Sequence, residues 1–191
     1  MSRPTRKRAG ALRVVAGDLR GRRFDAPPGT GTRPTSDRVR QATFNALESM
    51  GAVHGAVAID AFAGSGALGI EALSRGAASV TFVDTDPAAL EVVRSNVRVL
   101  GLGPRAEVVA RTAAVAIEGG GPWDLVLLDP PYAHDGWVDL LEAVERRLAP
   151  EGVVVIESDR EVDLPGGLVG VRTRTYGGTV VRFAVRSGAA T

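Results

Sequence analysis

From residue 57 onward, short apolar runs alternate with segments in which apolar residues recur at helical spacing. Such alternation is typical of βαβ units, in which buried parallel strands are connected by helices that cover the faces of the sheet. We predict strands at residues 57–61, 79–83, 106–109, 124–128 and 152–157, and helices at about 67–75, 87–100 and 136–148. The fold class is therefore α/β.

The last part of the chain changes to a strict alternation of apolar and polar residues. Residues 169–175 and 179–185 alternate in this way on either side of Gly177-Gly178, which predicts an antiparallel β-hairpin. The five parallel strands and this hairpin would together make a seven-stranded, mostly parallel sheet with an antiparallel edge.

The first forty residues follow a different pattern. Residues 12–16 and 22–25 flank a glycine-containing turn and predict a small basic hairpin, followed by a linker rich in proline and glycine. Thr35-Ser36-Asp37 is expected to cap a helix over about 37–50. We therefore divide the chain into a basic N-terminal appendage, residues 1–30, and an α/β domain, residues 31–191.

Composition narrows the classes of function. The chain has no cysteine and two histidines, which excludes disulfides and thiolate sites and leaves little for a metal site, so we expect no metal. No apolar run approaches the ~18 to 20 residues of a membrane span. The basic N-terminus is not followed by an apolar segment and so lacks the pattern of a secretory signal, and we expect a cytoplasmic protein. We also expect a monomer.

The net charge of +1 hides a strong asymmetry. Residues 1–40 contain eleven Arg or Lys against three Asp, a net charge of +8, so the rest of the chain sums to −7. A basic arm on an acidic body suggests a polyanionic partner, although a solvated tail has the same pattern. Arg38 and Arg40 would stand in the first turns of a helix, where cations oppose the helix dipole, and an anionic ligand is one reason to accept that cost.

The first candidate site is a glycine-rich turn between a strand and a helix, Ile59 to Gly69. Glycines there let the backbone approach a ligand, and the N–H groups at the helix start face it. The same residues satisfy the G-x-G-x-x-G fingerprint of dinucleotide enzymes, which is weak by itself. Asp60 favours another ligand, because a carboxylate just before the turn suits the ammonium and sulfonium of S-adenosylmethionine better than a pyrophosphate.

An acid also ends the next strand. Asp84 lies at the carboxyl end of that strand, where α/β folds bind ligands, and it can accept hydrogen bonds from a ribose diol. Asp86 stands directly before Pro87 and is better explained as a helix cap.

The most specific motif is Asp129-Pro130-Pro131-Tyr132, at the end of the fourth strand. Consecutive prolines make this turn stiff and poor in N–H donors, so the Asp129 carboxylate and the Pro130 carbonyl can converge on one NH₂ group. The exocyclic amine of a base is a poor nucleophile, and two acceptors that favour a pyramidal nitrogen would raise its reactivity. Tyr132 would stack on an extruded base.

Together these segments resemble the class I, Rossmann-like methyltransferases, and the whole chain resembles the RsmD family of small-subunit ribosomal RNA guanine-N2 methyltransferases. The N-terminal arm and the stretch Arg33 to Arg40 point to this family, whereas the glycine and Asp-Pro-Pro-Tyr motifs are shared by many amino-methyltransferases. The resemblance implies S-adenosylmethionine as cofactor. It also implies ribosomal RNA, in an assembling or assembled small subunit, as substrate, with guanine 966 of 16S rRNA as the target.

The resemblance also implies the roles of individual residues. Asp84 stands where the family usually has Glu, and Thr112 stands where this class often has an Asp near the adenine, so the backbone of Ala113 is expected to serve there. The expected cofactor contacts are Asp60, Phe62, Gly64, Ser65, Gly66, Asp84, Thr112 and Ala113. The expected catalytic residues are Asp129, Pro130, Pro131 and Tyr132. The expected RNA contacts are Arg13, Arg20, Arg22, Arg23, Arg33, Arg38 and Arg40.

The sequence motifs by themselves leave other hypotheses about function open. A dehydrogenase would share the glycine turn but lacks a visible hydride-transfer constellation, and a DNA adenine methyltransferase would share Asp-Pro-Pro-Tyr but needs a target-recognition insert. Protein glutamine methyltransferases typically have Asn in place of Asp129. A non-catalytic RNA-binding assembly protein would use the basic arm alone. We treat His54 and His134 as incidental, and Trp123 and Trp137 as packing residues.

Overall fold

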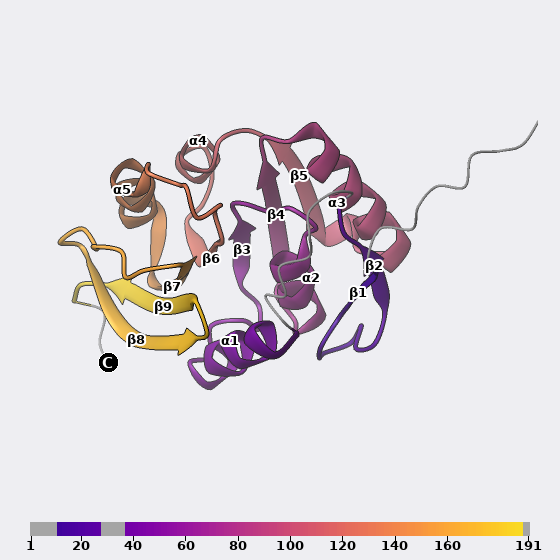
Figure 1. Cartoon of the computed structure of the whole chain (residues 1–191), viewed down its shortest axis with the longest axis horizontal. Coiled ribbons are helices and arrows are strands. Elements are labelled where there is room, and N and C mark those ends of the chain that lie inside the picture. The colour runs from indigo at the N-terminus through magenta and orange to yellow at the C-terminus, as the bar shows by residue number, and fades with distance from the viewer. Residues whose placement is uncertain (1–10, 28–36, 189–191) are drawn as a thin grey trace, which may run out of the picture.

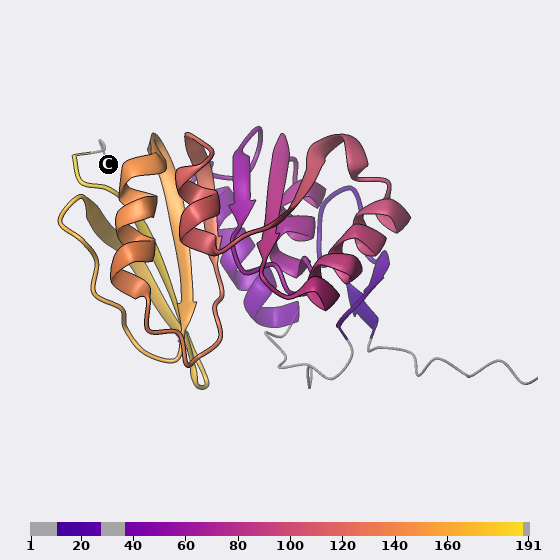
Figure 2. The same cartoon turned by 90° about the horizontal axis from the view of Figure 1, so that it is seen from above.

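The main body of the protein is one seven-stranded sheet with helices on both faces (Figures 1 and 2). The computed structural model describes residues 11–27 and 37–188. The sheet strands are β3 (Val57–Asp60), β4 (Ser79–Asp84), β5 (Ala106–Ala110), β6 (Trp123–Leu128), β7 (Leu148–Ser158), β8 (Leu168–Tyr176) and β9 (Thr179–Arg186). The helices are α1 (Asp37–Ser49), α2 (Ala67–Ser74), α3 (Pro87–Leu100), α4 (Ala113–Glu118) and α5 (Trp137–Arg147), with a short 3₁₀ helix, η1, at Gly103–Arg105.

The strand order is β5-β4-β3-β6-β7-β9-β8. The first five strands of this order are parallel, whereas β9 pairs antiparallel with both β7 and β8. This arrangement confirms the predicted fold class, including the antiparallel edge hairpin. The chain moves outward from β3 to β5 and then returns to place β6 on the other side of β3. That reversal of direction is where open α/β sheets bind ligands, outside the carboxyl ends of the strands.

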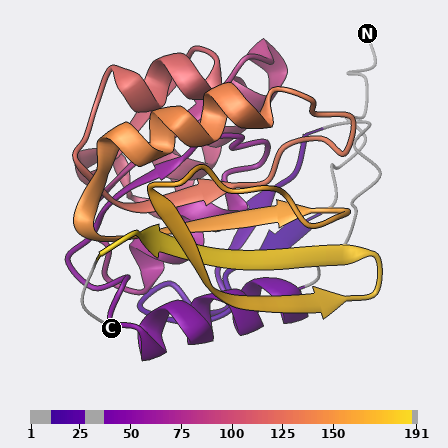
Figure 3. The same ribbon diagram turned by 90° about the vertical axis from the view of Figure 1, so that its left-hand side faces the viewer.

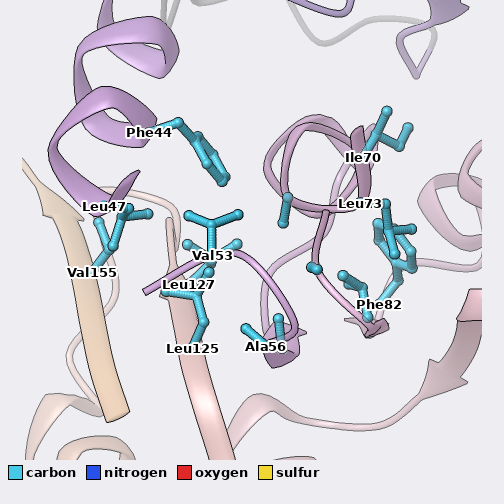
Figure 4. Close-up of a cluster of buried hydrophobic side chains, with 14 of the residues drawn as sticks. Phe44, Leu47, Val53, Ala56, Ile70, Leu73, Phe82, Leu125, Leu127 and Val155 are labelled. Carbon is cyan, nitrogen blue, oxygen red and sulfur yellow. The ribbon is translucent and has the colours of Figure 1, made fainter. Parts of the chain in front are cut away.

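Two apolar layers hold the helices on the sheet. One layer packs α1, α2 and α3 against one face, and Figure 4 shows part of it, with Phe44 and Leu47 of α1 and Phe82 of β4 fully buried. The other layer packs α4 and α5 against the opposite face, around residues such as Leu141. The helix α4 was not predicted from the sequence, because six residues are too few to show a helical period.

The predicted N-terminal hairpin is present as β1 (Ala11–Arg13) paired with β2 (Arg23–Asp25). It lies beside α3 (Figure 1) and shares the main apolar core, because Val14 and Phe24 are buried in the same cluster as α1 to α3. Asn96 of α3 accepts a hydrogen bond from the Asp25 N–H and donates one to the Asp25 carbonyl, both at 2.9 Å. The proposed boundary at residue 30 lies outside the described residues, as do Thr35 and Ser36 of the expected helix cap.

A buried carboxylate ties this hairpin to α1 and α2. Glu71 of α2 accepts hydrogen bonds from the N–H groups of Val15 and Ala16, at 2.9 and 3.0 Å. The same carboxylate forms ion pairs with Arg75, at 2.9 Å, and with Arg40 of α1, at 3.5 Å. All three charged side chains are at most 3% exposed. A buried charge is stable only where it is paired in this way.

Among the helices that the structure describes, none is long and apolar enough to cross a membrane.

Replacing Glu71 by Gln is expected to lower the free energy of unfolding by about 3 to 5 kcal/mol, because Arg40 and Arg75 then lose their one buried counter-charge and keep only the exposed carboxylates of Asp37 and Glu48. Urea denaturation of the variant and the wild type measures the difference. The matched control is Glu91→Gln, an exposed position on α3, for which a change within about 0.5 kcal/mol is expected. Equal losses in the two variants would show that Glu71 does not link the elements energetically.

Candidate active site

The glycine-rich turn joins β3 to α2 and requires glycine at specific positions. Gly64 and Gly66 have φ values of +53° and +81°, a region that favours glycine. Gly69, on α2, has an ordinary backbone, but a Cβ there would lie 2.3 Å from the ring of Phe82. The third glycine therefore lets α2 pack closely against β4, and the first two shape the turn.

Asp60, the last residue of β3, is a buried carboxylate with one oxygen lacking a partner. Its Oδ2 accepts a hydrogen bond from the Gly69 N–H at 2.9 Å, whereas its Oδ1 is buried with no partner in the structure. Burial, together with the negative charges of Asp129 and Asp84, raises the pKa of Asp60 to about 7, and the hydrogen bond from Gly69 opposes that shift. A cation placed against Oδ1 would satisfy the oxygen and stabilise its charge.

Asp84 ends the neighbouring strand β4 and holds the turn in place. Its Oδ2 accepts from the Gly64 N–H at 2.8 Å, and its Oδ1 accepts from the Asp86 N–H at 2.9 Å. Each oxygen keeps a further lone pair for a hydroxyl donor. Asp86 caps α3 by accepting from the Ala88 N–H at 2.9 Å, which confirms its interpretation as a helix cap.

A pocket of about 350 Å³ opens beside Asp84. Four of the residues predicted to contact a cofactor line this pocket together: Phe62, Asp84, Thr112 and Ala113. Thr112 precedes α4, so the turn that follows β5 reaches the same cavity as the turn that follows β4. Asp60, Gly64, Ser65 and Gly66 lie outside its lining, although Ala61 and Phe62 border it directly after Asp60.

The Asp129–Tyr132 segment, which we call the proline corner, follows β6 next to β3. The Ala61 N–H donates to the Leu127 carbonyl at 3.0 Å, which keeps the ends of the two strands level. Asp129 is half-buried and follows Leu127, the partner of Asp60 in the sheet, by two residues, and its negative charge contributes to the raised pKa of Asp60. The Tyr132 hydroxyl lies 3.2 Å from the hydroxyl of Thr179, the first residue of β9. The corner therefore adjoins the glycine turn.

On the sequence alone we treat His134 as incidental, but it lines the pocket. Its ring meets the rings of Phe62 and Trp137 edge to face, with centroids 5.4 and 5.1 Å apart. The ring atom Nε2 is buried without a partner, and the backbone N–H of His134 donates to the Pro131 carbonyl at 2.8 Å. In the sequence, the one signal for a location at the pocket is that His134 follows Tyr132 by two residues. Its ring partner Phe62 is distant in the sequence and gives no such signal.

The arginines assigned to RNA fall into three groups. Arg13, Arg20, Arg22 and Arg23 are exposed on the N-terminal hairpin, and Arg38 is exposed at the start of α1. Arg33 lies outside the described residues. Arg40 is 2% exposed, donates to the Arg13 carbonyl at 2.5 Å and pairs with Glu71, so its assignment as an RNA contact is wrong. The buried carboxylate, and not an external anion, explains a cation in the first turns of α1.

This sheet order, with the glycine turn after β3, an acid ending β4 and the proline corner after β6, defines a Rossmann-like class I methyltransferase fold. A family model described as Conserved hypothetical protein 95 matches residues 12–185. The chain belongs to that family, the RsmD family, as the sequence motifs indicated.

Individual relatives cover most of the chain. Ribosomal RNA small subunit methyltransferase D of Escherichia coli K12 is 35% identical over 86% of this chain and 83% of its own length. YlbH of Bacillus subtilis, a candidate rRNA methyltransferase, is 39% identical over 93% of this chain and all of its own length. The solved structure of yhhF, a candidate methyltransferase from E. coli, has a TM-score of 0.83 at 35% identity and covers 93% of this chain and 98% of its own.

The raised pKa of Asp60 predicts a pH dependence of stability. Because the folded protein keeps a proton on Asp60 up to about pH 7, the stability that this proton contributes is complete below pH ~4 and is lost as the pH rises towards 7. The free energy of unfolding of the wild type, minus that of Asp60→Asn, should therefore fall by up to about 1.4 kcal/mol per pH unit over this window.

Denaturant unfolding of both proteins between pH 4.5 and 8 checks this expectation. Asp135→Asn, at an exposed position in the loop after the proline corner, is the control and should give a constant difference. A constant difference for Asp60→Asn as well would show that Asp60 titrates like an exposed carboxyl.

Proposed function

We propose that this protein transfers the methyl group of S-adenosylmethionine to the exocyclic N2 amine of a guanine in small-subunit ribosomal RNA. The observation that carries the proposal is the position of the proline corner, which begins two residues after Leu127, the partner of the buried Asp60 in the sheet, and is followed by His134, which lines a pocket of nucleoside size. The name of the E. coli relative supports ribosomal RNA of the small subunit as the substrate. The choice of guanine N2, and of guanine 966, remains a prediction from the family resemblance.

The residues present fit S-adenosylmethionine. The unpartnered Asp60 Oδ1 suits the ammonium of its methionine part, and the Asp84 carboxylate suits the ribose hydroxyls. The pocket next to Asp84 suits the adenine, with Phe62, Thr112 and Ala113 around it. When bound, the cofactor supplies an electrophilic methyl carbon. Side-chain and backbone groups of this chain position the target amine and accept its proton.

The proline corner prepares the nucleophile. The Asp129 carboxylate and the Pro130 carbonyl accept hydrogen bonds from the target NH₂ group, which favours a pyramidal nitrogen with an available lone pair. Tyr132 stacks on the extruded base, and the contact of its hydroxyl with Thr179 holds the ring in place. The Asp129 carboxylate is also the nearest base for the proton that the nitrogen loses after transfer. Holding the reacting atoms about 3 to 3.5 Å apart supplies several kcal/mol of rate acceleration.

Replacing Asp129 by Ala should reduce methyl transfer at least a hundred-fold, because the amine loses its charged acceptor, while the affinity for S-adenosylmethionine stays within a few-fold. Transfer of labelled methyl groups to small ribosomal subunits from a strain that lacks the enzyme measures the first quantity, and calorimetry measures the second. Mapping the modified base then distinguishes guanine N2 from the alternative, adenine N6.

Asp135→Ala serves as the control, because it removes a nearby exposed carboxylate and should keep wild-type transfer. Wild-type turnover by Asp129→Ala would reject the assigned role. A wild type that binds RNA but transfers no methyl group would instead favour the non-catalytic assembly protein.

The exposed arginines of the N-terminal hairpin are proposed to contact RNA phosphates. Deleting the hairpin would not test this, because Val14 and Phe24 belong to the core and Glu71 would lose two hydrogen bonds. Replacing Arg20 and Arg23 by Gln should instead weaken RNA binding and flatten the plot of log affinity against log salt by about 0.7 to 0.9 per lost contact. Arg→Lys variants at both positions should keep most of the slope; an unchanged slope in the Gln variant would remove these residues from the interface.

A further inference from the structure

A second basic surface lies between α1 and the edge hairpin. A groove of about 220 Å³ runs there, and Figure 3 shows α1 lying along β8. The groove is lined from α1 by Ala42, Asn45, Ala46 and Ser49, and from the hairpin by Arg172, Arg174, Tyr176 and Phe183. We call it the α1–β8 groove. Its lining contains two arginines and two aromatic rings and no acidic residue.

A β-bulge turns these arginines towards α1. The pairing of β8 with β9 slips between Gly170 and Arg172, so Arg172 lies opposite Phe183 and Arg174 lies opposite Val181. Phe183 and Val181 belong to the apolar layer of α1 to α3, whereas Leu168, before the bulge, belongs to the layer of α4 and α5. With regular alternation, residues 172, 174 and 176 would share the face of Leu168. The extra residue moves all three to the α1 side, and bulges often re-aim side chains near functional sites.

The groove continues directly from the proline corner. Tyr176 ends β8 and pairs across the hairpin with Thr179, whose hydroxyl meets that of Tyr132. A nucleotide chain whose target base reaches Tyr132 is therefore close to Tyr176, and the next positions along β8 on that face are Arg174 and Arg172. The order from the corner outward is an aromatic ring followed by two cations.

The charges in the groove are available to an anion. Arg172 and Arg174 are exposed, and within the part of the chain that the structure describes neither forms an ion pair. Arg174 donates one hydrogen bond, to the Thr173 carbonyl at 3.1 Å, which leaves most of its five N–H donors free. Glu48 of α1 is the acidic residue nearest in sequence to the α1 lining, and its carboxylate is held by Arg75 at 2.8 Å. Guanidinium groups suit phosphate oxygens, and aromatic rings in a basic groove stack on bases.

We propose that the α1–β8 groove binds the RNA strand that flanks the methylated base, with Arg172 and Arg174 on its phosphates and Tyr176 against a neighbouring base. This inference rests on the proposed function, since it assigns the path of the same substrate. It adds a second contact region to the N-terminal hairpin, which lies next to α3, away from β8 (Figure 1).

The test compares Arg172→Gln/Arg174→Gln with the wild type. The probe is an unmodified transcript of small-subunit ribosomal RNA, and its binding is measured over a series of salt concentrations. The variant should bind about ten-fold more weakly near physiological salt, and its log–log salt slope should be flatter by about 1.4 to 1.8, as for two lost phosphate contacts. The KM for RNA should rise with kcat retained, and the affinity for S-adenosylmethionine should not change.

The control is Arg146→Gln/Arg147→Gln, which removes the same formal charge from α5 on the opposite face of the sheet, where Glu118 and Glu142 pair with these arginines. It should keep the wild-type slope, and Arg172→Lys/Arg174→Lys should recover most of the binding. A double Gln variant with wild-type affinity and slope, or one no different from the α5 control, would overturn the inference. A flattened slope in a protein whose wild type transfers no methyl group would support the groove and reject the proposed function.

Discussion

The site depends on one hydrogen bond, from the Gly69 N–H to Asp60 Oδ2, which holds a carboxylate in the core with its other oxygen unpartnered. Because β3, β4 and β6 are parallel neighbours, their last acids, Asp60 and Asp84, and Asp129 just beyond β6, meet at one edge of the sheet. The burial of Asp60 and the negative charges of Asp84 and Asp129 near it make its ionised form unfavourable. A cationic group against Asp60 Oδ1 would relieve both effects, so the electrostatics of this arrangement favour a positively charged ligand.

Local patterns were enough to predict most of the architecture. The strand runs, the glycine turn, the Asp86 cap and both hairpins depend on residues close together in the sequence, and each is present. The burial of Arg40 could not be predicted from such local patterns. Whether an arginine contacts RNA or lies buried depends on a distant partner, Glu71, and nothing around Arg40 in the sequence identifies that carboxylate. A charge run therefore predicts a basic surface better than it predicts which of its members reach the surface.

In the candidate site, too, the residues near strand ends could be predicted and those brought together only by the fold could not. Phe62, Asp84, Thr112 and Ala113 were placed from strand ends and from the family resemblance, and they line one pocket. His134 was missed, because only the fold brings it against Phe62. The bulge in β8 was missed for a related reason. The residues around it alternate regularly, and a slip in pairing belongs to two strands together, so the face that Arg172 occupies could not be read from one of them.

The N-terminal hairpin is fitted to α2, so substitutions in one of the two segments constrain those in the other. Its turn fits against α2 so closely that a Cβ on Gly17 would lie 1.9 Å from the Ser74 carbonyl oxygen, and the Glu71 carboxylate accepts the N–H groups that follow β1. The basic hairpin is thus not a portable module. Grafting it onto another methyltransferase, or exchanging it between relatives, would succeed only if the matching surface of α2 were transplanted as well, so the two segments must diversify as a unit.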